Sequence, residues 1–452
     1  MNMYLKEFKE DDSDISERYD RARMLAQPLT VCTVDQLFKF VYKAPGTEIF
    51  AATLKYSKLI LDEIQSYEPR IIAIIIYGLK TIQEMGGRFA IITATFPPVL
   101  RHFMEKCKLI EGKHYQFKDF TGSEYQTDQF PRHKIQIRKS EMDIQEILEQ
   151  GKDKKVLVIC NTVSRAQNIY REIQEETDEV HLLHSHYIRR DRAFLENEIM
   201  NFARSEETGI WITTQIVEAS LDIDFDILYT EMCTADSLLQ RMGRCNRMGR
   251  YFPEEANITI YDNRNGVGNN RVYDLDMYER SLNLLKKYEG IPFGEDMKTA
   301  YMNQVYDPNE IKETEYYKEI EKWLDKFSTI HPAEYTSKEA KVRDIKSITV
   351  VPEEIYREKQ ELFEYGMDFL RQSNIRREVK SLIRSRLEDM TLSLSIFNDY
   401  PDGVDRSCIG SKNDRPVMDI HRAVLKYDFN PETGKGAGLL SDKKPEMDGI
   451  FM

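Results

Sequence analysis

The sequence predicts an α/β protein with parallel sheets, and three observations support that fold class. Short apolar runs, such as residues 58–62 and 155–161, have the length of buried strands and end in polar side chains. Amphipathic segments with the period of a helix lie between these runs. The alternation appears in two separate series along the 452 residues, so we expect two sheets, each covered by helices.

The first series lies in the N-terminal third of the chain. We expect strands at Lys58–Asp62 and Arg88–Thr95. The apolar run that begins at Ile71 also has the composition of a strand. We interpret it as a helix, because its apolar pattern continues to Met85 and stops at Gly86, and glycine is common just after a helix end.

The second series begins near residue 150, after the polar stretch EQGKDKK at 149–155. An amphipathic segment at 164–176 predicts a helix with Ser164 as its N-cap. Apolar runs predict four strands, at Lys155–Asn161, Val180–Leu183, Gly209–Thr214 and Phe225–Thr230.

Changes of composition divide the chain into four predicted segments. The first sheet is assigned to residues 1–148 and the second to 149–262. Residues 263–330 begin with the loop DNRNGVGNN and continue as an acidic, helix-rich linker. Residues 331–452 combine a strand at Ser347–Val351 with helices and a glycine-rich tail, which predicts a small α+β C-terminal domain.

Composition narrows the class of protein. The net charge of −13 excludes a globally basic nucleic-acid binder, so any DNA contact must lie in a local groove. No run of about eighteen apolar residues predicts a membrane span, and the acidic N-terminal segment lacks the apolar core of a signal peptide. The six cysteines form no C-x-x-C pair, which favours a reducing cytoplasm and argues against a structural zinc site.

Two adjacent carboxylates, Asp62 and Glu63, follow the first predicted strand. Such a pair at the carboxyl end of a buried parallel strand suits ATP hydrolysis, because one carboxylate can hold Mg²⁺ and the other can polarise water. An isolated Asp-Glu pair is more commonly a solvated strand end, and at this point the alternative stays open. Thr93 and Thr95 end the next strand and place two hydroxyls at the same edge of the sheet.

The segment QRMGRCNRMGR at 240–250 carries four arginines in an acidic chain. Helical spacing places Gln240, Arg244 and Arg247 on one face. One amide and two guanidiniums on one face can surround a γ-phosphate. The alternative is an ion-paired surface helix beside acidic neighbours, which is the commoner explanation of an arbitrary arginine cluster.

Taken in order, these motifs resemble those of superfamily 2 helicases, in which two RecA-like lobes close on ATP. The residues within these motifs are similar to those of the effector helicase–nuclease of type I CRISPR interference. That family is recruited to a target-bound Cascade complex. The resemblance spans residues 28–262 and extends loosely to RDIKSITVVP at 343–352. It is carried by VCTVDQLFKF (31–40), LILDEIQSYEP (59–69), FAIITATFPP (89–98), VLVICNTVSRAQ (156–167), LLHSHYIRRDR (182–192), TTQIVEASLDIDFDILYTE (213–231) and SLLQRMGRCNRMGR (237–250).

The resemblance implies an ATP site between an incomplete first lobe and a complete second one. Asp62 would hold Mg²⁺ and Glu63 would activate water, while Gln240, Arg244 and Arg247 would face the γ-phosphate from the second lobe. The resemblance implies that five further residues couple the nucleotide to the lobes: Thr93, Thr95, Glu218, Asp222 and Arg241.

The resemblance also implies a track for single-stranded DNA, along which the family moves 3′ to 5′. Contacts there would be made to phosphates and would tolerate any base sequence. The implied residues are Thr33, Asn161, Thr162, Arg165 and Ser220.

Two parts of the family pattern do not occur in these 452 residues. There is no G-x-x-x-x-G-K-[ST] phosphate loop, and no histidine is followed by aspartate, as the family's HD nuclease requires. We therefore expect a C-terminal portion of such a helicase that hydrolyses ATP poorly alone and leaves a strand edge open at Phe89–Thr93. A separate chain could supply the phosphate loop and the nuclease.

Alternatives stay open at several points. The chain could be an inactive remnant that binds DNA or Cascade, whereas an RNA helicase is disfavoured by the spellings DEIQ and TATFPP. The arginine-rich segment 370–389 either covers a DNA exit or is a solvated helix, and the second is favoured. His184 and His186 have no carboxylates at ligand spacing, so we expect them to be structural.

Overall fold

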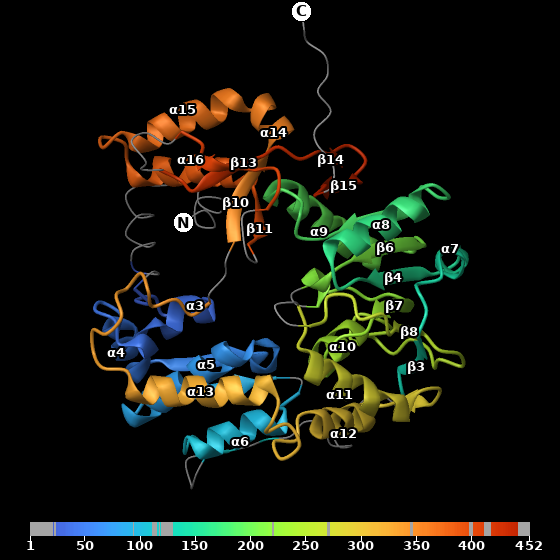
Figure 1. Ribbon diagram of the computed structural model, residues 1–452, viewed down its shortest axis with the longest axis horizontal. Helices are drawn as coiled ribbons and strands as arrows, with labels where there is room; N and C mark the ends of the chain where they lie inside the picture. The colour runs from blue at the N-terminus through green and yellow to red at the C-terminus, as the bar shows by residue number, and fades with distance from the viewer. Residues whose placement is uncertain are drawn as a thin grey trace, which may run out of the picture.

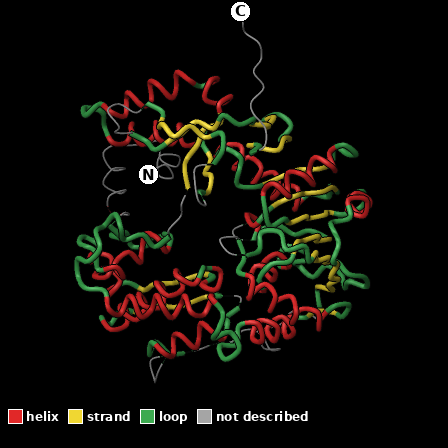
Figure 2. Tube along the Cα trace, in the orientation of Figure 1, coloured by secondary structure: helices red, strands yellow, loops and turns green. Residues whose placement is uncertain are grey.

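The structure is a computed structural model. It describes residues 21, 24–93, 95–110, 115–116, 118, 130–218, 221–268, 272–343, 347–396, 401–410 and 417–441. Figure 1 shows two α/β parts, called here the first and the second lobe, and a C-terminal domain beside them. Figure 2 shows that helices border the strands of both lobes. The α/β class expected from the sequence is confirmed.

The second lobe is built on a seven-stranded sheet in the order β5-β6-β4-β7-β8-β3-β9. All of its pairs are parallel except that of β3 with β9. Its strands are β3 (His133–Arg138), β4 (Lys155–Ile159), β5 (Val180–Leu183), β6 (Gly209–Thr213), β7 (Ile227–Glu231), β8 (Ile258–Tyr261) and β9 (Pro292–Phe293).

Helices cover both faces of this sheet, because the central strand places apolar side chains on each of its two faces. Val156 and Val158 of β4 share a buried cluster with Ile169, whereas Leu157 and Ile159 belong to the cluster on the other face. The first face is covered by α7 (Ile144–Gly151) and α8 (Val163–Gln174), and the second by α9 (Arg189–Arg204) and α10 (Ala235–Met242). A short 3₁₀ turn, η4 (Gln215–Val217), follows β6.

The first lobe contains two parallel strands in the described part of the chain. Asp62, at the end of β1, lies opposite Ile92, at the end of β2. The predicted helix between them forms as α5, whose residues Ile71–Ile76 are buried. The elements are α3 (Val34–Leu37), η1 (Phe38–Tyr42), α4 (Glu48–Tyr56), β1 (Lys58–Asp62), η2 (Ile64–Ser66), α5 (Pro69–Glu84), β2 (Arg88–Ile92) and α6 (Pro98–Lys106).

The predicted helical linker joins both lobes. Its last helix packs along α5, where the Arg70 guanidinium lies 4.5 Å from the centre of the Trp323 ring. Its earlier helices pack against one another and against α10 of the second lobe. The segment comprises α11 (Leu275–Leu285), η5 (Lys286–Tyr288), α12 (Glu295–Val305) and α13 (Glu315–Thr329).

The C-terminal domain has a four-stranded sheet in the order β11-β10-β13-β12 and a separate hairpin. The hairpin consists of β14 and β15 and lies against the second lobe, with β15 beside β5. The elements are β10 (Ser347–Pro352), α14 (Glu353–Glu358), α15 (Gln360–Arg371), α16 (Arg377–Asp389), β11 (Leu392–Ser395), β12 (Val404–Cys408), β13 (Ile420–Ala423), β14 (Tyr427–Asn430) and β15 (Lys435–Leu439).

The glycines at 436 and 438 lie in strand β15, which is held against the second lobe. Leu439 N–H donates to the carbonyl of His186 at 2.9 Å. Gly438 has a φ of +69°, and a Cβ at this position would lie 2.7 Å from the carbonyl oxygen of His186. Glycine is thus required for the close approach of the tail to the second lobe.

Several predicted boundaries differ from those observed. Residues 133–148 were assigned to the first segment, but β3 pairs with β8 of the second sheet and α7 covers that sheet. The stretch EQGKDKK is the end of α7 and a turn into β4, so its polarity marks no boundary between lobes. Thr162, not Ser164, caps α8, because its hydroxyl accepts from the N–H of Arg165. The arginine-rich segment 370–389 forms two helices with a break at 372–376.

Among the described residues, no helix combines the length and the apolar character that crossing a membrane requires.

Candidate functional site

The motif residues of the first lobe meet at the carboxyl ends of β1 and β2. Glu63 has a left-handed backbone with a φ of 52°, and its N–H donates to the carbonyl of Ile92 at 3.0 Å. Such a conformation is uncommon for a residue with a side chain, and it turns the chain sharply at the end of β1. Asp62 is exposed at the same strand end, so both carboxylates are held at this edge.

Gln65 connects the two motifs of this lobe. Its side-chain amide donates to Glu63, and its carbonyl oxygen is hydrogen-bonded by the hydroxyl of Thr93. The Thr93 hydroxyl also lies 2.5 Å from the carbonyl oxygen of Thr95. The sequence analysis did not single out Gln65. The available signal was its place two residues after the carboxylate pair, close enough to turn back to it.

Arg241 of α10 is the centre of a buried hydrogen-bond network. Its side chain is 0% exposed, and each of its N–H groups has an acceptor. The acceptors are Glu218 Oε1 at 2.8 Å, Thr230 Oγ1 at 2.9 Å, the Glu231 carbonyl at 3.0 Å, Asn161 Oδ1 at 2.9 Å and the Tyr273 hydroxyl at 2.7 Å. In this arrangement Arg241 positions the strands around it and has no N–H left for a phosphate.

The other three arginines lie beside the acidic segment that precedes β7. Arg244 donates to the carbonyls of Val217 and Glu218, at 2.9 Å and 2.7 Å. Arg247 Nη1 is 3.3 Å from Asp222 Oδ1. Arg250 Nε is 3.8 Å from Asp224 Oδ2.

Asp224 also fixes the turn that follows α10. Its carboxylate accepts from the backbone N–H of Arg247 at 2.7 Å and of Met248 at 3.3 Å. Arg247 and Arg250 are therefore each paired with a carboxylate of their own chain, whereas Arg244 contacts backbone carbonyls. The ion pair of Arg247 is accessible to solvent, because the side chain of its partner Asp222 is 73% exposed.

The motifs of the two lobes meet where α10 packs against η2, directly after Asp62 and Glu63. The pKa of Arg244 shows the same proximity. Burial, the largest effect, and the charge of Arg247 lower this pKa, while nearby carboxylates, among them Glu63 of the first lobe, act in the opposite direction. Arg244 and Glu63 thus belong to one electrostatic environment.

Of the residues expected along a DNA track, Thr162 and Arg165 share a hydrogen bond at the start of α8. Asn161 is buried, and its side chain is used by Arg241 and by the carbonyls of Met232 and Asn265. Thr162 is a helix cap, and Thr33 is exposed just before α3. Ser220 lies outside the described residues.

Arg165, the remaining residue of the expected track, is engaged by acidic residues. Its Nη2 donates to Glu141, and its Nε lies 3.9 Å from the buried Glu231.

His184 and His186 hold the C-terminal hairpin, and their hydrogen bonds are those of structural side chains. His184 Nε2 lies 3.2 Å from the carbonyl of Ala437, and its Nδ1 accepts from the N–H of His186 at 3.1 Å. Burial lowers the pKa of both rings, that of His186 to about 4. Both rings are therefore neutral near pH 7.

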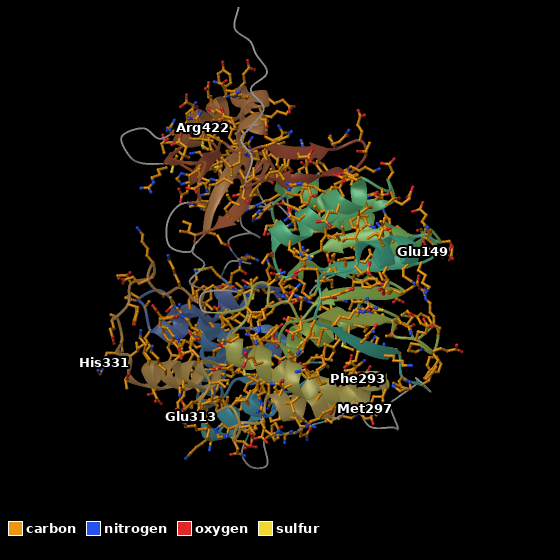
Figure 3. The ribbon with its side chains drawn as sticks, turned by 45° about the vertical axis from the view of Figure 1, so that its right-hand side comes forward. Glu149, Phe293, Met297, Glu313, His331 and Arg422 are labelled. Atoms are coloured by element: carbon orange, nitrogen blue, oxygen red, sulfur yellow. The ribbon has the colours of Figure 1, made fainter. Side chains whose placement is uncertain are left out.

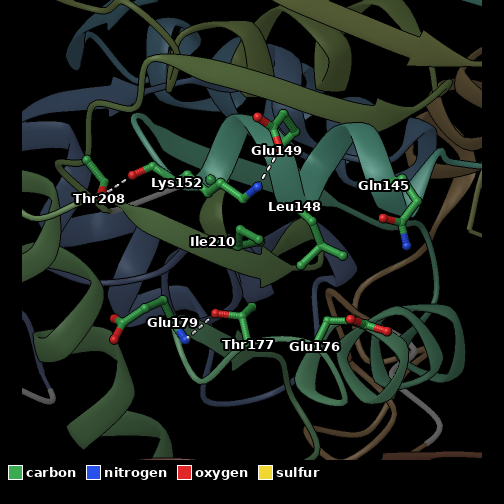
Figure 4. Close-up of a pocket in the computed structure, with 10 residues that line it drawn as sticks. Gln145, Leu148, Glu149, Lys152, Glu176, Thr177, Glu179, Thr208 and Ile210 are labelled. Atoms are coloured by element: carbon green, nitrogen blue, oxygen red, sulfur yellow. Dashed lines mark hydrogen bonds and ion pairs between the residues drawn. The ribbon is translucent and has the colours of Figure 1, made fainter.

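A hollow of about 320 Å³ lies on the second lobe, at the opposite side from these motifs. Figure 4 shows residues that line it, including Thr177, Thr208 and Ile210. Thr177 and Thr208 precede β5 and β6, so the hollow lies at the amino ends of the strands. Ligand sites of parallel sheets lie at the carboxyl ends, which leaves this hollow outside the candidate site.

Comparisons with known proteins agree with the motif series. The family model described as CRISPR-associated nuclease/helicase Cas3, C-terminal, matches residues 152–250. The CRISPR-associated nuclease/helicase Cas3 of Methanothermobacter thermautotrophicus is 30% identical over 339 residues, which cover 69% of this chain and 40% of that protein. Residues 152–250 thus match the C-terminal model of the Cas3 helicases, and the chain is similar to a curated Cas3 protein over 69% of its length. It spans about two fifths of the length of that curated Cas3 relative.

Solved Cas3 structures share the fold. T. fusca Cas3 with AMPPNP superimposes with a TM-score of 0.70 at 16% identity, covering 93% of this chain and 58% of that one. A chain of a CRISPR RNA-guided surveillance complex in a pre-nicking state superimposes with a TM-score of 0.62 at 15% identity, covering 95% and 63%. The two RecA-like lobes and the small α+β domain of this chain therefore have the Cas3 arrangement.

Proposed function

We propose that this chain is the motor part of a type I CRISPR helicase, which moves along single-stranded DNA with ATP after recruitment to a Cascade-type complex. One observation carries the proposal: α10, which bears Gln240, packs on the turn that follows Asp62 and Glu63. Carboxylates from one lobe and arginines from the other thus lie on the two sides of one interface, as ATP hydrolysis between lobes requires. The nucleotide-bound T. fusca Cas3 structure and the surveillance-complex structure support the choice of ATP and Cascade.

The carboxylate pair fits a Mg²⁺–nucleotide. Asp62 offers exposed carboxylate oxygens at the strand end, and oxygen ligands are those that Mg²⁺ takes. Bound there, Mg²⁺ would neutralise charge on the β- and γ-phosphates. Glu63 would orient the attacking water, because Gln65 fixes its carboxylate.

The arginines of the second lobe would stabilise the charge that develops on the γ-phosphate. Arg247 is suited to this because its partner Asp222 is exposed, so a phosphate can replace that carboxylate at a low desolvation cost. Gln240 and Arg244 would complete the contact from α10 and the turn after it. Arg241 would act through Glu218, by holding the segment that joins the nucleotide to the strand.

Phosphate binding would come from residues outside these 452, since they contain no G-x-x-x-x-G-K-[ST]. Loop amides and a lysine hold the β- and γ-phosphates in such ATPases. We propose that a segment carrying this loop, on the same or a separate chain, completes the first lobe beside β2.

The decisive experiment compares ATP hydrolysis by the 452-residue chain alone and together with the polypeptide encoded directly upstream. We expect little hydrolysis by the chain alone and turnover stimulated by single-stranded DNA in the mixture. Glu63→Gln should abolish this turnover while nucleotide binding persists. Brisk DNA-stimulated hydrolysis by the chain alone would contradict the proposed dependence on outside residues.

A second candidate function is that of a non-catalytic module that binds DNA or Cascade. It is favoured by the arginine contacts, since every arginine of 240–250 is already engaged within the chain. In the same experiment, a mixture that binds single-stranded DNA or Cascade without any hydrolysis would select this candidate.

A further inference from the structure

The C-terminal domain brings a cysteine, an aspartate and a histidine together on one face of its sheet. Strands β12 and β13 are antiparallel, and Cys408 at the end of β12 lies directly opposite His421. Asp419 precedes His421 by two residues, so both side chains project from the same face of the chain. Figure 3 labels Arg422, the next residue of β13, and so locates this part of the domain.

The donor atoms of the three side chains converge on one point. Cys408 Sγ is 3.1 Å from Asp419 Oδ1 and 3.7 Å from His421 Nε2. Asp419 Oδ1 is 3.1 Å from the same Nε2. Ligand atoms around a tetrahedral Zn²⁺, with bonds of about 2.0–2.3 Å, are separated by about 3.3–3.6 Å. The observed separations are near these values without any movement of the backbone.

The histidine ring is oriented as a metal ligand is. His421 Nδ1 lies 3.0 Å from the backbone carbonyl of Asp405, so this nitrogen carries a hydrogen and donates. In the neutral ring Nε2 then presents a lone pair to a carboxylate oxygen. Two acceptors at that separation repel each other unless a cation or a proton lies between them. A backbone carbonyl on the far nitrogen is also a usual outer partner of a metal-bound histidine.

The geometry differs from that of a cysteine nucleophile with a histidine base. In such a triad the thiol and the carboxylate contact opposite nitrogens of the ring. Here Cys408 and Asp419 share Nε2. Burial and Asp419 raise the pKa of the Cys408 thiol to about 11, so without a cation the thiol is protonated and unreactive.

We propose that Cys408, Asp419 and His421 form a Zn²⁺ site that joins the ends of the β12–β13 connection. Sulfur and imidazole nitrogen favour Zn²⁺ over Mg²⁺, which prefers oxygen ligands alone. The ion can enter from the solvent, because the side chain of Asp419 is 78% exposed while His421 is buried. Three protein ligands leave the fourth position to water or to a further group.

The proposal is independent of the ATP site, since the cluster lies in the C-terminal sheet. It also differs from the expectation that the cysteine pattern argues against a structural zinc site. That expectation considered C-x-x-C spacing along the chain, whereas this cluster forms between two paired strands, from residues that are eleven and two positions apart.

The test uses the full 452-residue chain, stripped with a chelator and reloaded with Zn²⁺ or Co²⁺. We expect one Zn²⁺ per chain and, with Co²⁺, a thiolate-to-cobalt charge-transfer band in the near ultraviolet. Cys408→Ser should abolish that band. Asp419→Asn should keep it but weaken Zn²⁺ binding at least tenfold. Since Asp419 is exposed, this second variant tests the site without endangering the fold.

Cys107→Ser is the matched control, because Cys107 is also a free, partly buried cysteine but has no place in the cluster. The Cys107→Ser variant should bind Zn²⁺ and Co²⁺ as the unmodified chain does. Substoichiometric zinc, a cobalt band that survives Cys408→Ser, or equal affinity after Asp419→Asn would each overturn the proposal. The hydrogen bond that the Cys408 thiol donates to Asp419 would then account for the contact.

Discussion

The sheets of the two lobes carry similar apolar strands but bury them to different extents. All five residues of β4, and likewise of β6 and β7, are buried. In the first lobe only Leu61 of β1 is fully buried, while Ile60 and Ile92 are 63% and 59% exposed. Composition is thus not what decides burial here.

The difference follows from what covers each face. Leu59, Phe89 and Ile91 pack against the cluster that includes α5. Ile60 and Ile92 are on the opposite face, which they share with Asp62, the expected magnesium ligand. Helices cover both faces of the second sheet, whereas the described residues cover one face of the first. Within the described residues, the second sheet is therefore covered on both faces, and the first presents an apolar face beside Asp62.

The largest expected effect is on ATP turnover, and it follows from substitution of Arg247. With hydrolysis reconstituted as proposed above, Arg247→Ala should lower the turnover about 10³-fold, because an arginine finger contributes that much to phosphoryl transfer. The free energy of unfolding should change by less than about 1 kcal/mol, since the Asp222 pair is exposed. Turnover and urea denaturation measure the two quantities.

Arg250→Ala is the control for this variant. Arg250 has the same charge and a similar surface pair, but it lies beyond the proposed phosphate contact. Its loss should leave turnover unchanged. Equal losses in the two variants would mean that the cluster acts only through its general charge, and no loss in either would support the non-catalytic candidate.

Arg241→Ala should have the largest effect on stability. The substitution removes the Arg241 donors of Glu218 and of the buried Asn161, and breaking such a buried pair costs about 3–5 kcal/mol. Denaturant unfolding followed by circular dichroism measures the loss. Arg241→Lys should recover only part of it, because an ammonium has fewer donors and no planar fork. A loss below about 1 kcal/mol would show that the network relaxes around the gap.

The sequence was sufficient for elements whose pattern is local. Strands β1 and β5 occupy the predicted residues, and the helix after β1 was recognised from the length of its apolar pattern. The predicted convergence of the two lobes at their motifs relied on the family resemblance. Periodicity alone cannot state which strand ends meet across two sheets.

What the sequence could not show depends on contacts between distant residues. The burial of Arg241 requires acceptors from several segments, among them Thr230 and Tyr273. β3 was missed because its short, half-polar run gives little strand signal, and pairing with β8 decides its place. The docking of β15 on the second lobe likewise has no local signature, and the close approach at Gly438 appears only in the structure.

A matched pair of isoleucine truncations tests the contrast between the sheets directly. Ile159 ends β4 and is buried, whereas Ile92 ends β2 and is largely exposed. Ile159→Ala should lower the free energy of unfolding by about 2–5 kcal/mol, and Ile92→Ala by less than about 1 kcal/mol. Equal losses would mean that the exposed face of the first sheet is covered in solution. Adding the proposed upstream polypeptide should increase the loss of unfolding free energy caused by Ile92→Ala and leave that caused by Ile159→Ala unchanged.

The smallest effect is a pH dependence of the second lobe through His186. Burial lowers the pKa of this ring to about 4, while an unfolded histidine has a pKa of about 6.5. Between these values the unfolded state binds the proton first, so stability should fall as the pH decreases from 6.5 towards 4. The slope is at most about 1.4 kcal/mol per pH unit for one histidine. Urea midpoints at pH 7.5 and 5 should show this fall in the unmodified chain and in His331→Ala, whose ring is exposed, and a smaller fall in His186→Gln. An equal fall in His186→Gln would assign the acid sensitivity to other groups, and the hairpin that docks beside His186 would then be held independently of its protonation.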